Sequence, residues 1–267
     1  MKLVKWALVG SALTSMVLIS GCETTTTVKE QISSNDRVVV QGKEADLEEA
    51  AQIRLSLGMR YLQNGKLEWA KKQLDKAYTH APHLPEVLFG MAYYFQTVDE
   101  LDLAEGYYQK VLDKSKNDSN YLNAYGVFLC DKKKAYEESV SYFLKAVDNP
   151  NYTKIGSTYE NAGFCSIKAE KYTDAENYFN KALNFNPNLT KSLYGLSSVY
   201  FESGNYNRAE AYLLRFEGLS KPSADSLLLG YKIGRRLNDQ VAINSYGEKL
   251  MQLYPNSEQA QTYLRMR

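Results

Sequence analysis

The sequence has 267 residues, and its 32 lysines and arginines nearly balance its 31 aspartates and glutamates. A charge this close to neutral excludes the electrostatic attraction that would hold a nucleic acid, so we expect no nucleic-acid partner. Hydrophobic residues make up 44% and charged residues 24% of the chain. This is the composition of a folded protein with a large buried core, and it excludes disorder throughout.

The first 21 residues have the pattern of a secretory signal peptide. Lys2 and Lys5 form a basic start, and residues 8–20 form an apolar stretch that is interrupted by small residues. The stretch is short for a helix that spans a bilayer. We therefore expect residues 1–21 to be a signal peptide that is removed.

The signal peptide runs into ISGC, residues 19–22, which resembles the lipobox of bacterial lipoproteins. The resemblance implies that Cys22 is lipidated and becomes the first residue of the mature chain, and two or three acyl chains anchor a protein stably. Glu23 stands where an aspartate retains lipoproteins of enteric bacteria in the inner membrane, which implies a lipid anchor in the outer membrane, on its periplasmic face. The alternative is a secretory signal that happens to contain a cysteine.

Residues 22–47 are expected to form a lipid-anchored flexible tether. After the cysteine they begin ETTTTVKEQISSNDR, and they show no apolar periodicity. A flexible chain of about 25 residues has a root-mean-square span on the order of 25–30 Å, which lets a domain reorient close to the membrane.

One helical pattern recurs through residues 48–267. In residues 57–82, Gly58 and Ala70 lie 12 positions apart and Pro82 ends the pattern. This resembles the tetratricopeptide repeat of about 34 residues, in which helix A and helix B pack closely through small residues. The same interval separates four further pairs: Ala92 and Ala104, Gly163 and Ala175, Ser197 and Ala209, and Gly230 and Ala242.

The repeats predict an all-α fold, a right-handed superhelical α-solenoid of six tetratricopeptide repeats. Gly126 and Ser139 lie 13 positions apart, which predicts one extra residue in the turn DKKKAY. Residues 257–267 are expected to form a short helix that caps the last repeat. The six repeats are expected near residues 51–84, 85–118, 119–155, 156–189, 190–222 and 223–256.

Groups that carry enzyme chemistry are scarce. The two histidines, His80 and His83, lie in the turn THAPHLP without nearby cysteines, so a zinc site lacks ligands. The sequence contains no phosphate-binding glycine loop, nucleophile elbow or HExxH motif. We therefore expect no enzyme, no catalytic residues, no metal site and no cofactor.

Apolar residues recur at helix A positions that face the concave side of such a solenoid. They suggest a groove in the first repeats that binds an apolar or amphipathic segment of a partner protein. The alternative is that the tether, a neighbouring helix or the C-terminal segment covers them. The partner-binding residues expected from this pattern are Leu55, Met59, Leu62, Phe89 and Tyr93.

Cys130 and Cys165 lie on the A helices of consecutive repeats, four and two positions after Gly126 and Gly163. At 1.5 Å of rise per residue their heights differ by about 3 Å, so facing side chains could approach the roughly 4.4–6.8 Å between Cα atoms that a disulfide needs. The oxidising compartment implied by the lipobox favours a bond. Two buried free thiols are the alternative.

Three segments carry a more specific resemblance: NAYGVFLC at 123–130, NPNYTKIGSTYENAGFC at 149–165 and YPNSEQAQ at 254–261. Set among six repeats behind a lipobox, they resemble the PilF/PilW family of type IV pilus biogenesis/stability lipoproteins. The resemblance implies a pilotin, an outer-membrane lipoprotein that binds subunits of the pilus secretin and promotes their localisation and multimerisation. It also implies a disulfide between Cys130 and Cys165.

The chain departs from this family at DKKKAY, where a shorter turn with a glycine is usual, and the departure puts that local surface in doubt. The alternative function is a tetratricopeptide lipoprotein scaffold that serves β-barrel insertion or recruits cell-wall hydrolases.

Overall fold

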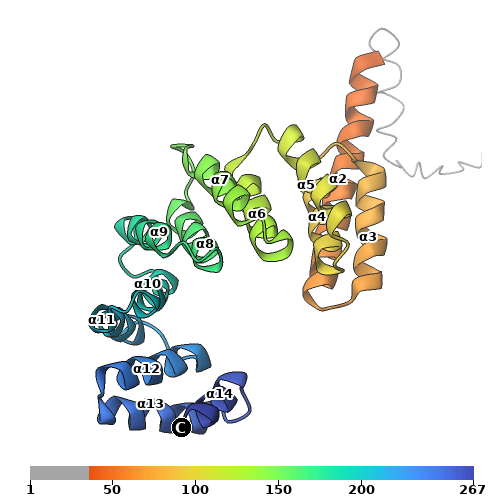
Figure 1. Cartoon of the computed structure of the whole chain (residues 1–267). Helices are drawn as coiled ribbons and strands as arrows, with labels where there is room; N and C mark the ends of the chain where they lie inside the picture. Colours follow the sequence, from red (N-terminus) through yellow and green to blue (C-terminus); the bar gives the residue numbers. More distant parts are fainter. Residues whose placement is uncertain (1–35) are drawn as a thin grey trace, which may run out of the picture. The chain divides into compact units, whose positions relative to one another are not determined.

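The computed structural model describes the backbone of residues 36–267 and the side chains of residues 45–267. The chain divides into two compact units, residues 1–49 and residues 50–267. Every regular element in the described part of the chain is a helix (Figure 1). The predicted all-α fold is confirmed, while the expected signal peptide and Cys22 lie outside the described residues.

The helices follow one another as pairs joined by short turns, and each pair contacts the next. Six pairs in the described residues match the six expected repeats. The pairs are α2 (Asp36–Gln63) with α3 (Leu67–His80), α4 (Pro85–Thr97) with α5 (Leu101–Lys114), α6 (Ser119–Phe128) with α7 (Tyr136–Val147), α8 (Ile155–Lys168) with α9 (Tyr172–Phe185), α10 (Thr190–Glu202) with α11 (Tyr206–Glu217), and α12 (Ala224–Leu237) with α13 (Gln240–Leu253).

Small residues let the helices of a pair approach closely. A Cβ added to Gly163 would lie 2.6 Å from the ring of Phe179, so only glycine leaves room for that ring. Two other close approaches carry a hydrogen bond: the hydroxyl of Ser139 donates to the carbonyl of Gly126, and that of Ser197 donates to the carbonyl of Ala209, each at 2.7 Å. The small residues predicted to face one another thus let the backbones of helix A and helix B of a repeat approach closely.

The sixth repeat packs in the same way at Gly230. A Cβ on Gly230 would meet the ring of Tyr246, four positions after Ala242, as one on Gly163 would meet Phe179, four positions after Ala175. Gly234 adds a second close approach in this pair, because a Cβ there would lie 3.0 Å from the Cβ of Ala242.

The extra residue of the third repeat was expected in the turn DKKKAY, residues 131–136, and the structure has a π-helical turn that overlaps the start of this segment. The π-helical turn η1 (Leu129–Lys133) directly continues α6, and Lys134 follows in the left-handed conformation that ends the helix. A π turn accommodates one additional residue in a helix. Because η1 includes Cys130, the insertion changes the end of helix A at the cysteine itself.

The flexible tether predicted for residues 22–47 is wrong for residues 36–47, because α2 begins at Asp36. The stretch EADLEEA, residues 44–50, consists almost entirely of strong helix formers. They extend α2 toward the N-terminus, before the start of the first repeat, although this segment has no apolar face. Helix propensity therefore predicts the helical conformation of this segment, whereas apolar periodicity does not.

Tyrosine hydroxyls link successive repeats. Tyr200 on α10 donates to Glu176 on α9 at 2.6 Å, and two further bonds follow the same scheme. A buried ring with a bonded hydroxyl gives both apolar contact and a polar partner, which is why tyrosine suits these positions between repeats. The two further bonds run from Tyr125 to Glu105 at 3.2 Å and from Tyr246 to Glu217 at 3.1 Å.

The last helix, α14 (Glu258–Met266), caps the sixth repeat as expected. Its Ala260 is fully buried, and the ring of Tyr263 packs edge-on against Tyr231 at 4.8 Å between centroids. A Cβ on Gly247 of α13 would lie 2.7 Å from the ring of Tyr263. The cap covers the apolar face that the last helix pair of a solenoid otherwise exposes.

Candidate functional site

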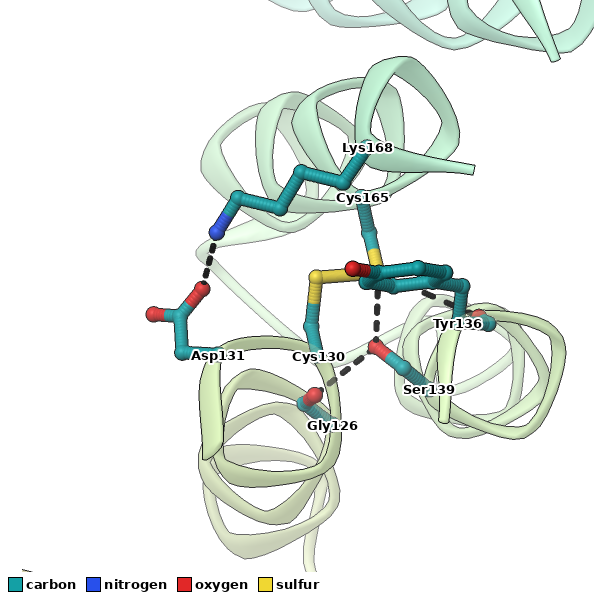
Figure 2. Close-up of polar contacts among 7 residues, drawn as sticks. All are labelled: Gly126, Cys130, Asp131, Tyr136, Ser139, Cys165 and Lys168. Carbon is teal, nitrogen blue, oxygen red and sulfur yellow. Dashed lines mark hydrogen bonds and ion pairs between the residues drawn. A yellow bond between two sulfur atoms is a disulfide. The ribbon is translucent and has the colours of Figure 1, made fainter. Parts of the chain in front are cut away.

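A disulfide joins Cys130 in η1 to Cys165 on α8 (Figure 2). The two Cα atoms lie 5.9 Å apart, and both residues are buried. Because the cysteines belong to the third and fourth repeats, the bond fastens one repeat to the next. Cys130 is therefore neither a nucleophile nor a thiolate ligand in this state.

The disulfide lies in a mostly apolar cluster with Phe143 and Ala162, and a few polar contacts accompany it. Ser139, fully buried on α7, places its hydroxyl oxygen 3.4 Å from the sulfur of Cys165 while it donates to Gly126. Figure 2 shows an ion pair between Lys168 and Asp131 on the outer side of the bond. The third and fourth repeats thus meet through one covalent bond with polar contacts on both sides.

A second ion pair fastens the same two repeats. Lys171 Nζ lies 2.9 Å from Glu137 Oε1, and this hydrogen bond lowers the pKa of Glu137. Both groups are exposed, so water and salt screen the attraction and it adds little to stability.

No group of three or more histidine, cysteine or carboxylate side chains in the described residues could hold a metal ion. Among the same residues, no helix is both long and apolar enough to span a bilayer.

The five predicted groove residues do not all lie at the surface. Leu62 is 6% exposed and belongs to a buried cluster with Leu74 and Met91, so its assignment to the groove is wrong. It faces the core because α4 packs against this side of α2. The other four are at least partly exposed, and Tyr93 is 39% exposed. We call Leu55, Met59, Phe89 and Tyr93 the first-repeats surface.

Contacts between α2 and α4 fix the first two of these side chains. A Cβ on Gly90 would lie 2.5 Å from Leu55 Cδ1 and 3.8 Å from Met59 Sδ. The absence of a side chain at Gly90 therefore lets Leu55 and Met59 extend across α4. Their partial burial leaves some apolar area for a partner.

Aromatic rings continue the surface along α4 to α6. Phe89 stacks with Tyr93 at 6.4 Å between centroids and meets Tyr121 of α6 at 5.4 Å. Burial raises the pKa of Tyr121 to about 12, because the charged phenolate is poorly hydrated there. Tyr121 was missed in the sequence because it lies outside the helix A positions that the repeat pattern assigns to the concave side.

Two further apolar residues of the first repeat are strongly exposed. Ile53 on α2 is 62% exposed and Trp69 on α3 is 55% exposed. The ring of Trp69 lies 6.0 Å from that of Tyr61. Neither was predicted, although Ile53 lies out of phase with the buried residues of its helix and could have been found by that signal.

The comparisons with known proteins agree with this architecture. The tetratricopeptide repeat family matches residues 150–189 and 190–221. The type IV pilus assembly protein PilF of Pseudomonas aeruginosa is 32% identical over 216 residues, which cover 81% of this chain and 85% of that protein. The chain belongs to the PilF/PilW family of type IV pilus biogenesis proteins.

Solved structures of the PilF/PilW family show the same fold. The crystal structure of PilW, described as a widely conserved type IV pilus biogenesis factor, has a TM-score of 0.74 and 27% identity, and covers 80% of this chain and 98% of that chain. The structure of Pseudomonas aeruginosa PilF has a TM-score of 0.71 and 32% identity, and covers 83% of this chain and all of that one. The relationship supports a role in pilus biogenesis.

Proposed function

We propose that this chain is an outer-membrane lipoprotein that binds subunits of the type IV pilus secretin and promotes their localisation and multimerisation. The observation that carries the proposal is its relationship to PilF, which extends over 81% of the chain. The repeat fold supports a binding role, because helical repeats present extended surfaces to other proteins.

In this proposal the first-repeats surface binds the secretin. Phe89 and Tyr93 stack on α4, Met59 of α2 approaches the same helix at Gly90, and the exposed Trp69 adds apolar area in the first repeat. Aromatic side chains and methionine are enriched where proteins bind one another. An amphipathic segment of the secretin could bury its apolar face here.

In this proposal the lipid on Cys22 anchors the chain in the outer membrane. In the same proposal residues 23–35, which lie between Cys22 and α2 in the sequence, connect the lipid to the helical part of the chain. The buried disulfide supports a periplasmic location, because such bonds persist in oxidising compartments. In this arrangement the chain acts by binding and carries out no chemistry.

The test is capture of the secretin by purified chain. Met59→Asp combined with Tyr93→Asp places two charges on the first-repeats surface, and we expect it to reduce capture at least about tenfold, since a desolvated charge in an apolar interface costs more than about 1.4 kcal/mol. Leu214→Asp is the matched control, because Leu214 is 56% exposed on α11. Unchanged capture by the double variant, with folding intact by circular dichroism, would contradict the proposal.

The same experiment separates the alternative scaffold functions. Recovery of β-barrel insertion factors or cell-wall hydrolases in place of secretin would assign the chain to one of those systems.

A further inference from the structure

A cavity of about 420 Å³ lies in the fifth and sixth repeats, far along the chain from the first-repeats surface. It is lined by Phe201 of α10, by Lys232, Arg235 and Arg236 of α12, and by Met266 of α14. Three of the five lining side chains are cations, and none is acidic. The cavity therefore has a positive wall beside an apolar one.

The arginines are held in position by contacts that leave their charge intact. Arg235 donates a hydrogen bond to the carbonyl of Met266 at 2.7 Å, and its guanidinium lies 5.9 Å from the ring centre of Tyr231. The guanidinium of Arg236 lies 5.8 Å from the ring centre of Tyr206. Stacking on an aromatic face orients a guanidinium and leaves its edge free to donate hydrogen bonds.

Within the described part of the chain, these cations form no ion pair. None of the ion pairs among the described residues involves Lys232, Arg235 or Arg236. Several lysines elsewhere are paired, for example Lys133 with Glu105 at 2.8 Å. Other cations of the described residues, such as Lys110 and Arg215, also lie outside these ion pairs, so what distinguishes the cluster is that its three cations line one cavity.

We propose that this cavity binds the carboxylate of an acidic residue in an extended peptide. A guanidinium presents parallel N–H groups that match the two oxygens of a carboxylate, and Lys232 adds a further donor. Phe201 and Met266 form the apolar wall for the neighbouring part of the peptide. The site is separate from the first-repeats surface, so this proposal can be tested independently of secretin binding at that surface.

One of the adjoining cavities favours a peptide over a membrane surface. It shares Phe201 and Lys232 with the first cavity, and its wall also includes the apolar Leu228 and Leu229 and the acidic Glu202 and Asp225. The two carboxylates repel an anionic lipid surface. A peptide can satisfy both cavities, with an acidic residue at the arginines and an apolar or basic residue beside it.

The test uses a capped hexapeptide with one central glutamate flanked by leucine and lysine, and a second peptide in which glutamine replaces that glutamate. Binding to the full chain is measured by isothermal titration at low salt. We expect the glutamate peptide to bind at least about tenfold more tightly, because charge-assisted hydrogen bonds are lost in the glutamine peptide. Equal affinity for the two peptides would overturn the proposal.

Substitutions in the cavity test whether the glutamate peptide binds there. Lys232→Ala with Arg236→Ala should weaken binding of the glutamate peptide about tenfold. Arg215→Ala should leave it unchanged. Arg215 is a matched control, since its guanidinium also lies over a tyrosine, 5.3 Å from the ring centre of Tyr212, but it does not line either cavity. Equal losses in both variants, with thermal unfolding unchanged, would contradict the assigned site.

Two competitors distinguish the source of the anion. Inorganic phosphate and phosphatidylglycerol vesicles are added at matched concentrations of anionic groups. If the site is built for a peptide, both should displace the glutamate peptide poorly. Displacement by vesicles at concentrations below those of free peptide would assign the cavity to a membrane surface, and comparable displacement by phosphate would assign it to a free anion.

Discussion

The carboxylate of Glu160 on α8 accepts two hydrogen bonds from Ser192 on α10, one from the backbone N–H at 2.9 Å and one from the hydroxyl at 3.0 Å. Glu160 is 6% exposed and Ser192 is fully buried. Ser192 lies in the first turn of α10, where backbone N–H groups have no partner within the helix. A side chain from the fourth repeat thus caps the first helix of the fifth.

Glu160→Ala should destabilise the protein by about 2 kcal/mol, because it leaves a buried N–H and a buried hydroxyl without their acceptor. Glu160→Gln keeps an acceptor oxygen and should cost less. Chemical denaturation of the two variants measures the difference. Equal stability of the alanine variant and the unaltered chain would show that the contact contributes nothing.

Removal of the disulfide should lower stability by about 4 kcal/mol. Cys130 and Cys165 are 35 positions apart, and the loop-entropy model assigns roughly this value to a loop of that length. The double variant Cys130→Ser with Cys165→Ser and the reduced unaltered chain should show similar unfolding midpoints. A midpoint equal to that of the oxidised chain would mean that the bond does not constrain the unfolded state.

Alkaline conditions should unfold the protein through its tyrosines. Burial raises the pKa of Tyr121 from 10.0 to about 12, and burial also raises the pKa of Tyr108 and Tyr200. A raised pKa in the folded state means that the neutral phenol is stabilised. Its contribution is complete below pH 10 and is lost as the pH rises toward about 12.

Tyrosinate absorbance and helical circular dichroism, followed together from pH 9 to pH 12, measure this effect. We expect a fraction of the tyrosines to ionise only as helix content falls, in one cooperative step. A titration in which all 22 tyrosines ionise near pH 10 while the helices persist would contradict the buried network.

Much of the fold could be predicted from the sequence because one pattern recurs. The intervals between small residues, such as Gly58 to Ala70, placed helix pairs that the structure confirms. The start of α2 at Asp36 could not be found in this way, because local propensity extends the helix beyond the apolar periodicity. The π turn at Cys130 was also missed, since a count of residues locates an insertion without its conformation.

The candidate surface could be predicted less well. A repeat position indicates which way a side chain points, but not whether the next repeat covers it, and Leu62 is buried for that reason. The cap formed by Glu160 and the cation cluster at Lys232 depend on contacts between neighbouring repeats. Periodicity within one repeat carries no signal for such contacts.

The most direct test of the proposed function is the location of secretin multimers in cells whose only copy of this chain carries Cys22→Ala. The variant should be present at normal levels and keep the helical circular dichroism of the unaltered chain, because Cys22 precedes the repeat domain. We predict that secretin multimers are strongly depleted from the outer-membrane fraction. Normal amounts of multimer in that fraction would contradict the claim that a lipid on this residue directs secretin assembly.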